Sequence, residues 1–196
     1  MQYQTNQDVR SGLKFIGEND SPKSSLSNSA TNFDELQESC KAARRFINYR
    51  LRSEAEVRLR LSKRFGTSVV RETLAQMYRE GLLNDERFAR MFTESRKNSR
   101  PKSASTVRRE LEMKGVSRDL SLSVTSDIDD LEAALYAASK KSRALSNLPE
   151  NKFHQKLIGH LRRRGFTYGI SKNAANQAWT ALWLIDPNPP ENPSIS

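Results

Sequence analysis

The sequence has few of the side chains on which disulfide frameworks, metal sites and most catalytic centres depend. Its 196 residues include a single cysteine, Cys40, so no disulfide can form within one chain, and a reducing compartment is expected. The two histidines, His154 and His160, lie on different faces of a predicted helix, with no cysteine or carboxylate cluster at ligand spacing. We therefore expect no bound metal ion and no catalytic thiol.

Other absences exclude further classes of protein. No apolar run approaches the ~20 residues that span a bilayer, and the N-terminus shows neither the apolar core nor the cleavage site of a secretory signal. The chain also lacks a glycine-rich phosphate loop, a serine-centred elbow and a pair of acids placed for catalysis. We expect a cytoplasmic protein that contacts no membrane, uses no cofactor and is not an enzyme.

Positive charge is present in excess and is unevenly distributed. Lysine and arginine total 33 against 23 acidic residues, a formal charge of +10. Residues 41–120 alone carry +11, whereas residues 1–40 carry −3 and residues 121–196 carry +2. Such a local excess attracts phosphate backbones or an acidic protein surface. For any single arginine, a solvated helix face with ion pairs is an equally good explanation.

One helical pattern recurs at an interval of 50 residues, marked by Leu61, Leu111 and Leu161. Each of these leucines is followed three residues later by a basic residue and six residues later by a hydroxyl residue: Arg64, Lys114 and Arg164, then Thr67, Ser117 and Thr167. Such self-similarity is typical of supersecondary units that stack in a row and bury their apolar faces against one another. The sequence therefore predicts an all-α fold, an elongated and curved tandem array of three three-helix repeats.

Composition and helix signals give the expected boundaries. The repeats are predicted at residues 33–82, 83–126 and 127–185, between a flexible tail at 1–32, rich in serine and asparagine, and a proline-rich tail at 186–196. The first helix is expected to begin at Asn32 or Asp34. Met91 and Met113 are assigned to the apolar stripes of their helices.

Capping side chains mark the helix starts within these repeats. Ser53 and Glu56 form a capping-box pattern, and Gly81 fits a left-handed helix end. The remaining starts are expected at Thr67, Asn84, Ser103 or Ser105, Ser117, and Asp127 or Asp129.

Four ordered motifs resemble those of one family. Residues 81–92 read Gly-Leu-Leu-Asn-Asp-Glu-Arg-Phe-Ala-Arg-Met-Phe and resemble the Gly-Leu-Leu-Asp-Asp-x-Arg-Phe-Ala-x-x-Phe signature of RecX regulatory proteins. Residues 52–58, 109–116 and 163–166 resemble that family's Arg-Ser-x-x-Glu-Leu-Arg, Glu-Leu-x-x-Lys-Gly-Ile and Arg-Arg-Gly-Phe elements. The resemblance extends over about residues 38–180. The first repeat departs from the pattern, because Phe65-Gly66 stands where the others have Gly115-Val116 and Gly165-Phe166.

The resemblance implies a partner and a mode of action. RecX-like proteins consist of tandem three-helix repeats and bind the RecA recombinase, chiefly its nucleoprotein filament. They suppress its ATP hydrolysis, strand exchange and co-protease activity in DNA repair and the SOS response, without catalysis. Capping of the filament end and binding along the filament groove both stay open. An elongated basic array suits such a target physically, since it contacts successive protomers and nearby DNA phosphates together.

The candidate partner-binding and DNA-binding residues are the basic side chains that flank the middle helix of each repeat. They are Arg58, Arg60, Lys63, Arg64, Arg108, Arg109, Lys114, Arg118, Arg162, Arg163 and Arg164. Arg87 is instead expected to pair with an acid and brace a joint between repeats. The expected partners are the RecA filament and the phosphate backbone of single- or double-stranded DNA, and the chain is expected to be a monomer. The alternatives are a basic helical DNA-binding module that acts without RecA, and a helical scaffold for another acidic protein.

Overall fold

The computed structural model describes residues 23–185, and over this range the chain is helical, with no β-strand. Nine α-helices and one 3-10 turn (η1) fall into three groups of three. The bounds are α1 Lys23–Tyr49, α2 Glu54–Leu61, α3 Thr67–Arg79, α4 Asp85–Ser99, α5 Ala104–Met113, α6 Arg118–Thr125, α7 Asp130–Ser142, η1 Arg143–Leu145, α8 Glu150–Arg162 and α9 Tyr168–Ile185.

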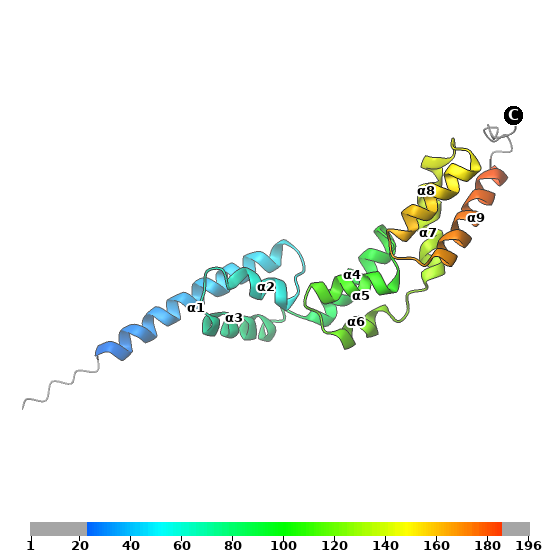
Figure 1. Cartoon of the computed structure of the whole chain (residues 1–196). Coiled ribbons are helices and arrows are strands. Elements are labelled where there is room, and N and C mark those ends of the chain that lie inside the picture. The colour runs from blue at the N-terminus through cyan, green and yellow to red at the C-terminus, as the bar shows by residue number, and fades with distance from the viewer. Residues whose placement is uncertain (1–22, 186–196) are drawn as a thin grey trace, which may run out of the picture.

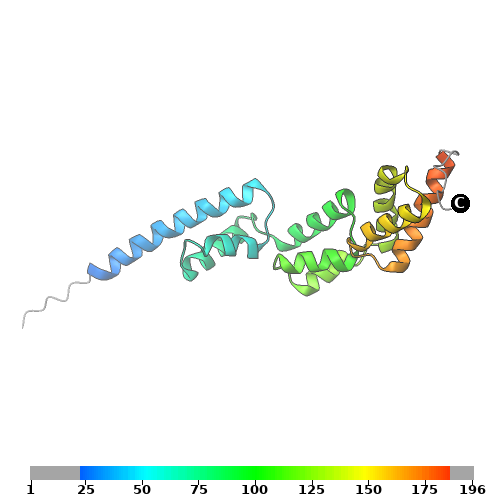
Figure 2. The ribbon, with the colours of Figure 1, turned by 45° about the horizontal axis from the view of Figure 1, so that its top comes forward.

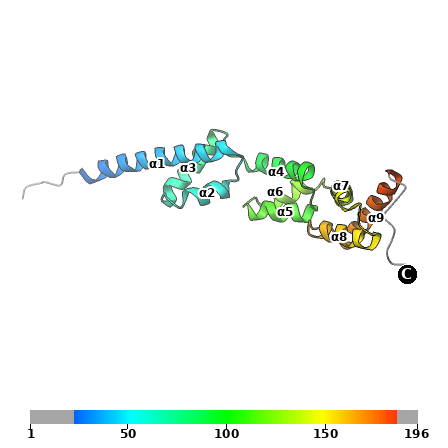
Figure 3. The same cartoon turned by 90° about the horizontal axis from the view of Figure 1, so that it is seen from above.

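The three groups follow one another in a row (Figure 1). The row is elongated and bends between its two ends, and α1 projects past α2 and α3 at the N-terminal end (Figures 2 and 3). This arrangement confirms the predicted tandem array of three-helix repeats. Among the described residues, none of the helices is long and apolar enough to cross a bilayer.

Each repeat has a small core of its own, built from equivalent positions. Leu61, Leu111 and Leu161 are buried, as are Val57, Val107 and Leu157, one helical turn earlier. The first core also contains Cys40 and Met77, and the third contains Phe153. A side chain spaced by four residues returns to the same helix face, so these pairs hold each middle helix against its two neighbours.

Most predicted helix starts are confirmed. Ser53 and Glu56 form the complete capping box, and Asn84 accepts a hydrogen bond from the Arg87 amide at 2.8 Å. Ser103, Ser117 and Asp129 are also N-caps. The assignment of Thr67 as a cap is wrong, because Gly66 holds the N-cap position and Thr67 is the first helical residue.

Three expectations differ from the structure. Helix α1 begins at Lys23, so residues 23–32 are helical rather than part of a tail; residues 1–22 and 186–196 lie outside the described range. Met91 and Met113 are 51% and 73% exposed instead of lining a core. Met113 lies two positions after buried Leu111, and this spacing on a helix points a side chain away from the face that Leu111 occupies.

The joint between the first and second repeats is a close backbone contact. Gly115 has φ +80°, and a Cβ on it would stand 2.2 Å from the Cβ of Ala55. Beside it, the Ser53 hydroxyl donates to the carbonyl of Lys114 at 2.6 Å, and the Glu54 amide donates to Asp85 Oδ1 at 2.8 Å. The start of α2 is thus held by the turn after α5 and by the first residue of α4.

The joint between the second and third repeats uses the equivalent positions. Gly165 has φ +91°, and a Cβ on it would overlap Thr106 Oγ1. The Ser103 amide donates to the carbonyl of Arg164 at 3.1 Å, and the Ala104 amide donates to Asp130 Oδ1 at 2.7 Å. Because both joints are built in the same way, the middle helices α2, α5 and α8 follow one another along the array.

Candidate partner-binding surface

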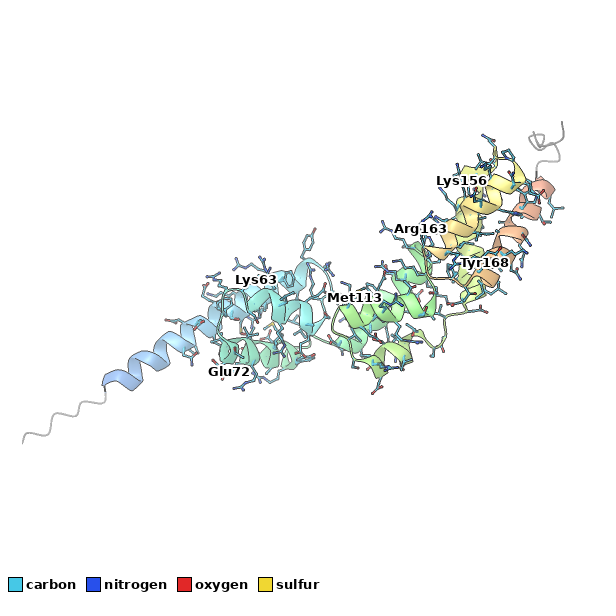
Figure 4. All side chains as sticks on the ribbon, in the orientation of Figure 1. Lys63, Glu72, Met113, Lys156, Arg163 and Tyr168 are labelled. Atoms are coloured by element: carbon cyan, nitrogen blue, oxygen red, sulfur yellow. The ribbon has the colours of Figure 1, made fainter. Side chains whose placement is uncertain are left out.

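The middle helices place equivalent residues on one edge of the array. Lys63, Met113 and Arg163 are separated by 50 residues each, and all three lie on the same side of the row (Figure 4). Glu72 of α3 and Tyr168 of α9 lie on the opposite side. We call the first side the middle-helix edge and define it by α2, α5, α8 and the turns that follow them.

In the first repeat the four candidate cations are all exposed. Arg58 pairs with Glu54 one turn before it, and Arg64 lies 3.3 Å from Glu38. Both pairs are open to solvent, where such contacts contribute only ~0–1 kcal/mol. Arg60 and Lys63 form no ion pair with any described residue. These two cations are free to meet an anionic partner.

In the second repeat the candidates divide into two kinds. Arg109 and Arg118 are exposed and form no ion pair within residues 23–185. Arg108 is half-buried, with Nη2 3.4 Å from Thr125 Oγ1, and its Nε has no acceptor in the described structure. The fourth candidate is Lys114, whose Nζ lies 3.1 Å from Glu56 Oε1 across the first joint.

In the third repeat Arg162 and Arg163 are exposed, and neither is ion-paired in the part of the chain that the structure describes. Arg164 is half-buried at the second joint. Its Nη1 donates to the carbonyl of Pro101 at 2.9 Å, and its Nε donates to His160 Nε2 at 2.9 Å. Burial, followed by the charge of Arg164, lowers the pKa of His160, so the ring stays neutral and accepts this bond.

Lys114 and Arg164 therefore occupy equivalent positions and make equivalent contacts with the preceding repeat. Each extends from the turn after its middle helix to an acceptor on the preceding repeat, Glu56 for Lys114 and Pro101 for Arg164. Burial alone would raise the pKa of Glu56, but hydrogen bonds from Lys114 and Arg50 outweigh it and lower that pKa below its ordinary value. The structure places these two cations at the joints rather than free on the edge.

The edge that remains is cationic but discontinuous. Its exposed and unpaired members, among the described residues, are Arg60, Lys63, Arg109, Arg162 and Arg163, whereas Arg118 begins α6 and lies outside this edge. Met113 interrupts the series at the position that Lys63 and Arg163 hold in the other repeats. A soft, exposed methionine between charged residues adds apolar contact area, which suits a protein partner as well as a nucleic acid.

The joint acids were missed by the sequence reasoning. Arg87 is exposed and forms no ion pair in the described range, so the expectation that it braces a joint is wrong. Asp85 and Asp130 do this instead, each accepting from the first amide of the preceding middle helix. Both acids come directly after an N-cap residue, and this shared position was the available signal. Each carboxylate also faces the positive end of a helix dipole, which is a favourable place for it.

Comparisons of sequence agree with this architecture. The family models for the second and third three-helix domains of RecX match residues 84–121 and 127–174. The regulatory protein RecX of Corynebacterium efficiens is 33% identical over 141 residues, which cover 67% of this chain and 67% of that protein. The regulatory protein RecX of Listeria monocytogenes is 29% identical over 157 residues, covering 78% of this chain. The match spans only 58% of the Listeria protein's length.

Solved structures show the same fold. The crystal structure of RecX from Lactobacillus salivarius has a TM-score of 0.61 and 20% identity, covering 75% of this chain and 98% of that one. A second crystal structure of a regulatory protein RecX has a TM-score of 0.65 and 17% identity, covering 83% and 81%. With the sequence matches and the joint geometry, these findings show that the chain belongs to the RecX family of regulatory proteins.

Proposed function

We propose that this protein is a non-enzymatic regulator in the cytoplasm that binds the RecA recombinase and its nucleoprotein filament. By binding, it inhibits recombination, ATP hydrolysis and co-protease activity in DNA repair and the SOS response. The observation that supports this most strongly is the pairing of RecX family membership with one exposed cationic edge that runs along three repeats.

The shape favours a polymeric target over a small ligand. Three repeats in a row offer three modest sets of contacts, and a filament offers its own sites at regular intervals. Once the first repeat has bound, the others bind at a high effective concentration, so affinity accumulates without one deep pocket. A rigid array also loses little conformational entropy when it binds.

The unpaired arginines and lysines also suit the DNA inside such a filament. Each cation that neutralises a phosphate of a single strand lowers the slope of log affinity against log salt by about 0.7. Five free cations are present on the edge, so binding through DNA would weaken steeply with salt. Binding through RecA alone would weaken less, because Met113 and other uncharged contacts do not respond to salt.

Cosedimentation with RecA filaments assembled on single-stranded DNA tests the proposal. We expect the wild-type protein to pellet with filaments at saturating, stoichiometric amounts. A variant that reverses two free edge charges, Arg109→Glu with Arg163→Glu, should need about tenfold more protein for the same pelleting, since like charges then face the anionic target. Arg108 is a poorer choice, because its half-buried guanidinium contacts Thr125.

The matched control reverses two exposed cations of α3, Arg71→Glu with Arg79→Glu. Helix α3 carries Glu72 on the opposite side of the array, and neither arginine forms an ion pair in the described structure. The control should pellet like the wild type. If the wild type stays in the supernatant at molar excess over RecA, the proposed partner is wrong.

The second candidate function is a basic DNA-binding module that acts without RecA. The free cations on all three repeats favour it, since three-helix units with a basic helix occur in helix-turn-helix proteins. This function requires tight and sequence-selective binding to duplex DNA in the absence of RecA. Binding that shows no sequence preference would leave the RecA-directed function as the better explanation.

A further inference from the structure

The first repeat contains a cleft on the side of its middle helix. It lies between the C-terminal half of α1 and helix α2 and has a volume of about 490 Å³. Its lining includes Arg45, Phe46, Tyr49, Arg52, Arg60 and Lys63. Lys63 belongs both to this cleft and to the middle-helix edge, so the two surfaces adjoin.

The cleft is positively charged, and of its cations only Arg64, paired with Glu38, and Arg52, near Glu56, have an acid beside them. None of its lining residues is acidic, and Arg45, Arg60 and Lys63 form no ion pair with a described residue. The one carboxylate near Arg52 is Glu56, at 3.9 Å. That carboxylate already binds Arg50 at 2.9 Å and Lys114 at 3.1 Å. A cluster of this kind lowers its own electrostatic energy by taking up an anion.

Aromatic rings accompany the cations. The guanidinium of Arg52 lies 4.0 Å from the centre of the Phe46 ring, and that of Arg60 lies 5.9 Å from it. Tyr49, the last residue of α1, is 84% exposed at the cleft. Cations beside an exposed aromatic face form the usual binding surface for single-stranded nucleic acid, in which phosphates meet the cations and a base stacks on the ring.

We propose that this cleft binds one or two nucleotides of a single strand, with backbone phosphates at Arg45, Arg60 and Lys63 and a base stacked on Tyr49. The inference deepens the DNA part of the proposed function and rests on it, but it does not require RecA. Single strands are favoured over duplex, because a base inside a duplex must be unstacked before it meets Tyr49. They are also favoured over an acidic peptide, which would use the cations and leave the ring without a role.

The charge state of Arg52 supports the same site. Burial, followed by the nearby charge of Arg50, lowers the pKa of Arg52. An arginine remains protonated even so, and its charge is therefore held at an energetic cost in the free protein. A phosphate bound in the cleft would offset this cost, as a carboxylate does for an arginine in an ion pair.

Salt-dependent binding of a fluorescein-labelled oligothymidine to the full-length protein, without RecA, tests the phosphate contacts. The double variant Arg45→Ala, Lys63→Ala should reduce the slope of log affinity against log salt by about 1.4, the value for two lost phosphate contacts on a single strand. The control Arg71→Ala, Arg79→Ala removes the same charge from α3 of the same repeat and should leave the slope unchanged. Equal slopes for the two variants would overturn the proposal.

Tyr49 tests the stacking contact separately. Tyr49→Ala should weaken oligothymidine binding about tenfold, whereas Tyr49→Phe keeps an aromatic face and should bind like the wild type. Tyr49 is largely exposed, so both variants should fold. The proposal is wrong if Tyr49→Ala binds normally, if duplex binds as tightly as the single strand, or if polyglutamate fills the cleft in place of oligothymidine.

These outcomes are distinct from those for RecA. Loss of oligothymidine binding in the cleft variants, with RecA cosedimentation absent even for the wild type, would support the cleft and reject the RecA partner. Normal cosedimentation, with oligothymidine binding indifferent to Tyr49, would reject the cleft and leave the regulator proposal in place.

Discussion

Two glycines fix the way in which neighbouring repeats meet. Gly115 and Gly165 have positive φ angles, and each lies where a Cβ would overlap a side chain of the preceding repeat, Ala55 or Thr106. Gly81 also has a positive φ, yet no atom lies within 4 Å of the place where its Cβ would be. At both joints a glycine is therefore required for two reasons, the left-handed backbone and the close approach of the preceding repeat. At Gly81 only the left-handed backbone requires it.

Gly115→Ala should destabilise the protein more than Gly81→Ala. The left-handed conformation costs an alanine about 1–2 kcal/mol at either site. At Gly115 the overlap with Ala55 adds about 1–3 kcal/mol. Urea unfolding monitored by circular dichroism measures the difference.

A double variant provides the control for this effect. With Ala55→Gly, the atom nearest a Cβ at position 115 is the Ala55 Cα, 3.7 Å away, which is ordinary van der Waals contact. Gly115→Ala should then cost no more than Gly81→Ala, relative to Ala55→Gly alone. An unchanged penalty in that background would contradict the joint contact.

Glu56 makes the first joint sensitive to acid. Its pKa in the folded chain lies below the ordinary value of 4.5, because its hydrogen bonds outweigh burial. Its contribution is thus fully present above pH 4.5 and is lost as pH falls through the lower, folded pKa. Glu56→Gln should cost about 1–2 kcal/mol at pH 7, and this difference from wild type should shrink toward pH 3.

The comparison with Glu72 isolates this contribution. Glu72 is exposed and forms no ion pair in the described structure, so Glu72→Gln should leave the wild-type dependence of stability on pH unchanged. Equal effects of the two substitutions at pH 7 would show that the Glu56–Lys114 contact contributes nothing to stability.

At the scale of elements, the N-cap of the middle helix α2 also contacts the next repeat. The Ser53 hydroxyl accepts from the Glu56 amide at 3.2 Å and also donates to the carbonyl of Lys114 in the next repeat. Ser117, by contrast, accepts from the Leu120 amide at 3.4 Å, and its side chain forms no hydrogen bond to another repeat within residues 23–185. Ser53 thus caps a helix and also stabilises a joint, whereas Ser117 only caps a helix.

Ser53→Ala should therefore be more harmful than Ser117→Ala. Loss of a cap costs about 0.5–2 kcal/mol in either case. Ser53→Ala also leaves the Lys114 carbonyl without the Ser53 hydroxyl, adding about 1 kcal/mol. Chemical denaturation of the two variants gives the comparison, and equal losses would mean that the Ser53–Lys114 bond is not made in solution.

The caps and the repeat interval were predictable from the sequence because both depend on residues close together in the chain. Ser53 with Glu56, Asn84 and Gly81 needed no knowledge of neighbouring repeats. The start of α1 was predicted too late because residues 23–31 lack an apolar pattern, yet they continue the helix that packing establishes further along.

The joints could not be predicted, since they pair residues that are far apart in the chain. Lys114 and Arg164 look like free cations in sequence, and only their distance to Glu56 and Pro101 shows the contrary. The exposure of Met113 and the cleft beside Tyr49 likewise depend on how helices pack. The charge pattern of the sequence indicated the basic residues of the edge. Only the tertiary contacts show which of them are free of a partner within the described residues.

At the scale of the whole molecule, the outer ends of the first and third repeats lack the joint residues. Phe65 occupies the position that the joint glycines Gly115 and Gly165 hold, and Phe153 occupies the position of the joint serines Ser53 and Ser103. Both phenylalanines are buried within their own repeats. The two phenylalanines therefore replace the residues that would form a joint of the same kind at these positions.

The protein should therefore be a monomer over a wide concentration range. Neither end carries the glycine or the serine needed to form a fourth joint with another copy. Sedimentation equilibrium should give a mass of 22.3 kDa, with no increase up to high micromolar protein. Oligomers that grow with concentration would show that the ends associate despite Phe65 and Phe153.

The most direct test of the central claim is the ATPase activity of RecA on single-stranded DNA, titrated with this protein. The wild type, and the control with Arg71→Glu and Arg79→Glu, should suppress ATP hydrolysis at stoichiometric amounts. The variant with Arg109→Glu and Arg163→Glu should need about tenfold more protein. Unchanged ATP turnover at a molar excess of the wild type, or equal suppression by the edge variant, would contradict regulation of RecA through the middle-helix edge.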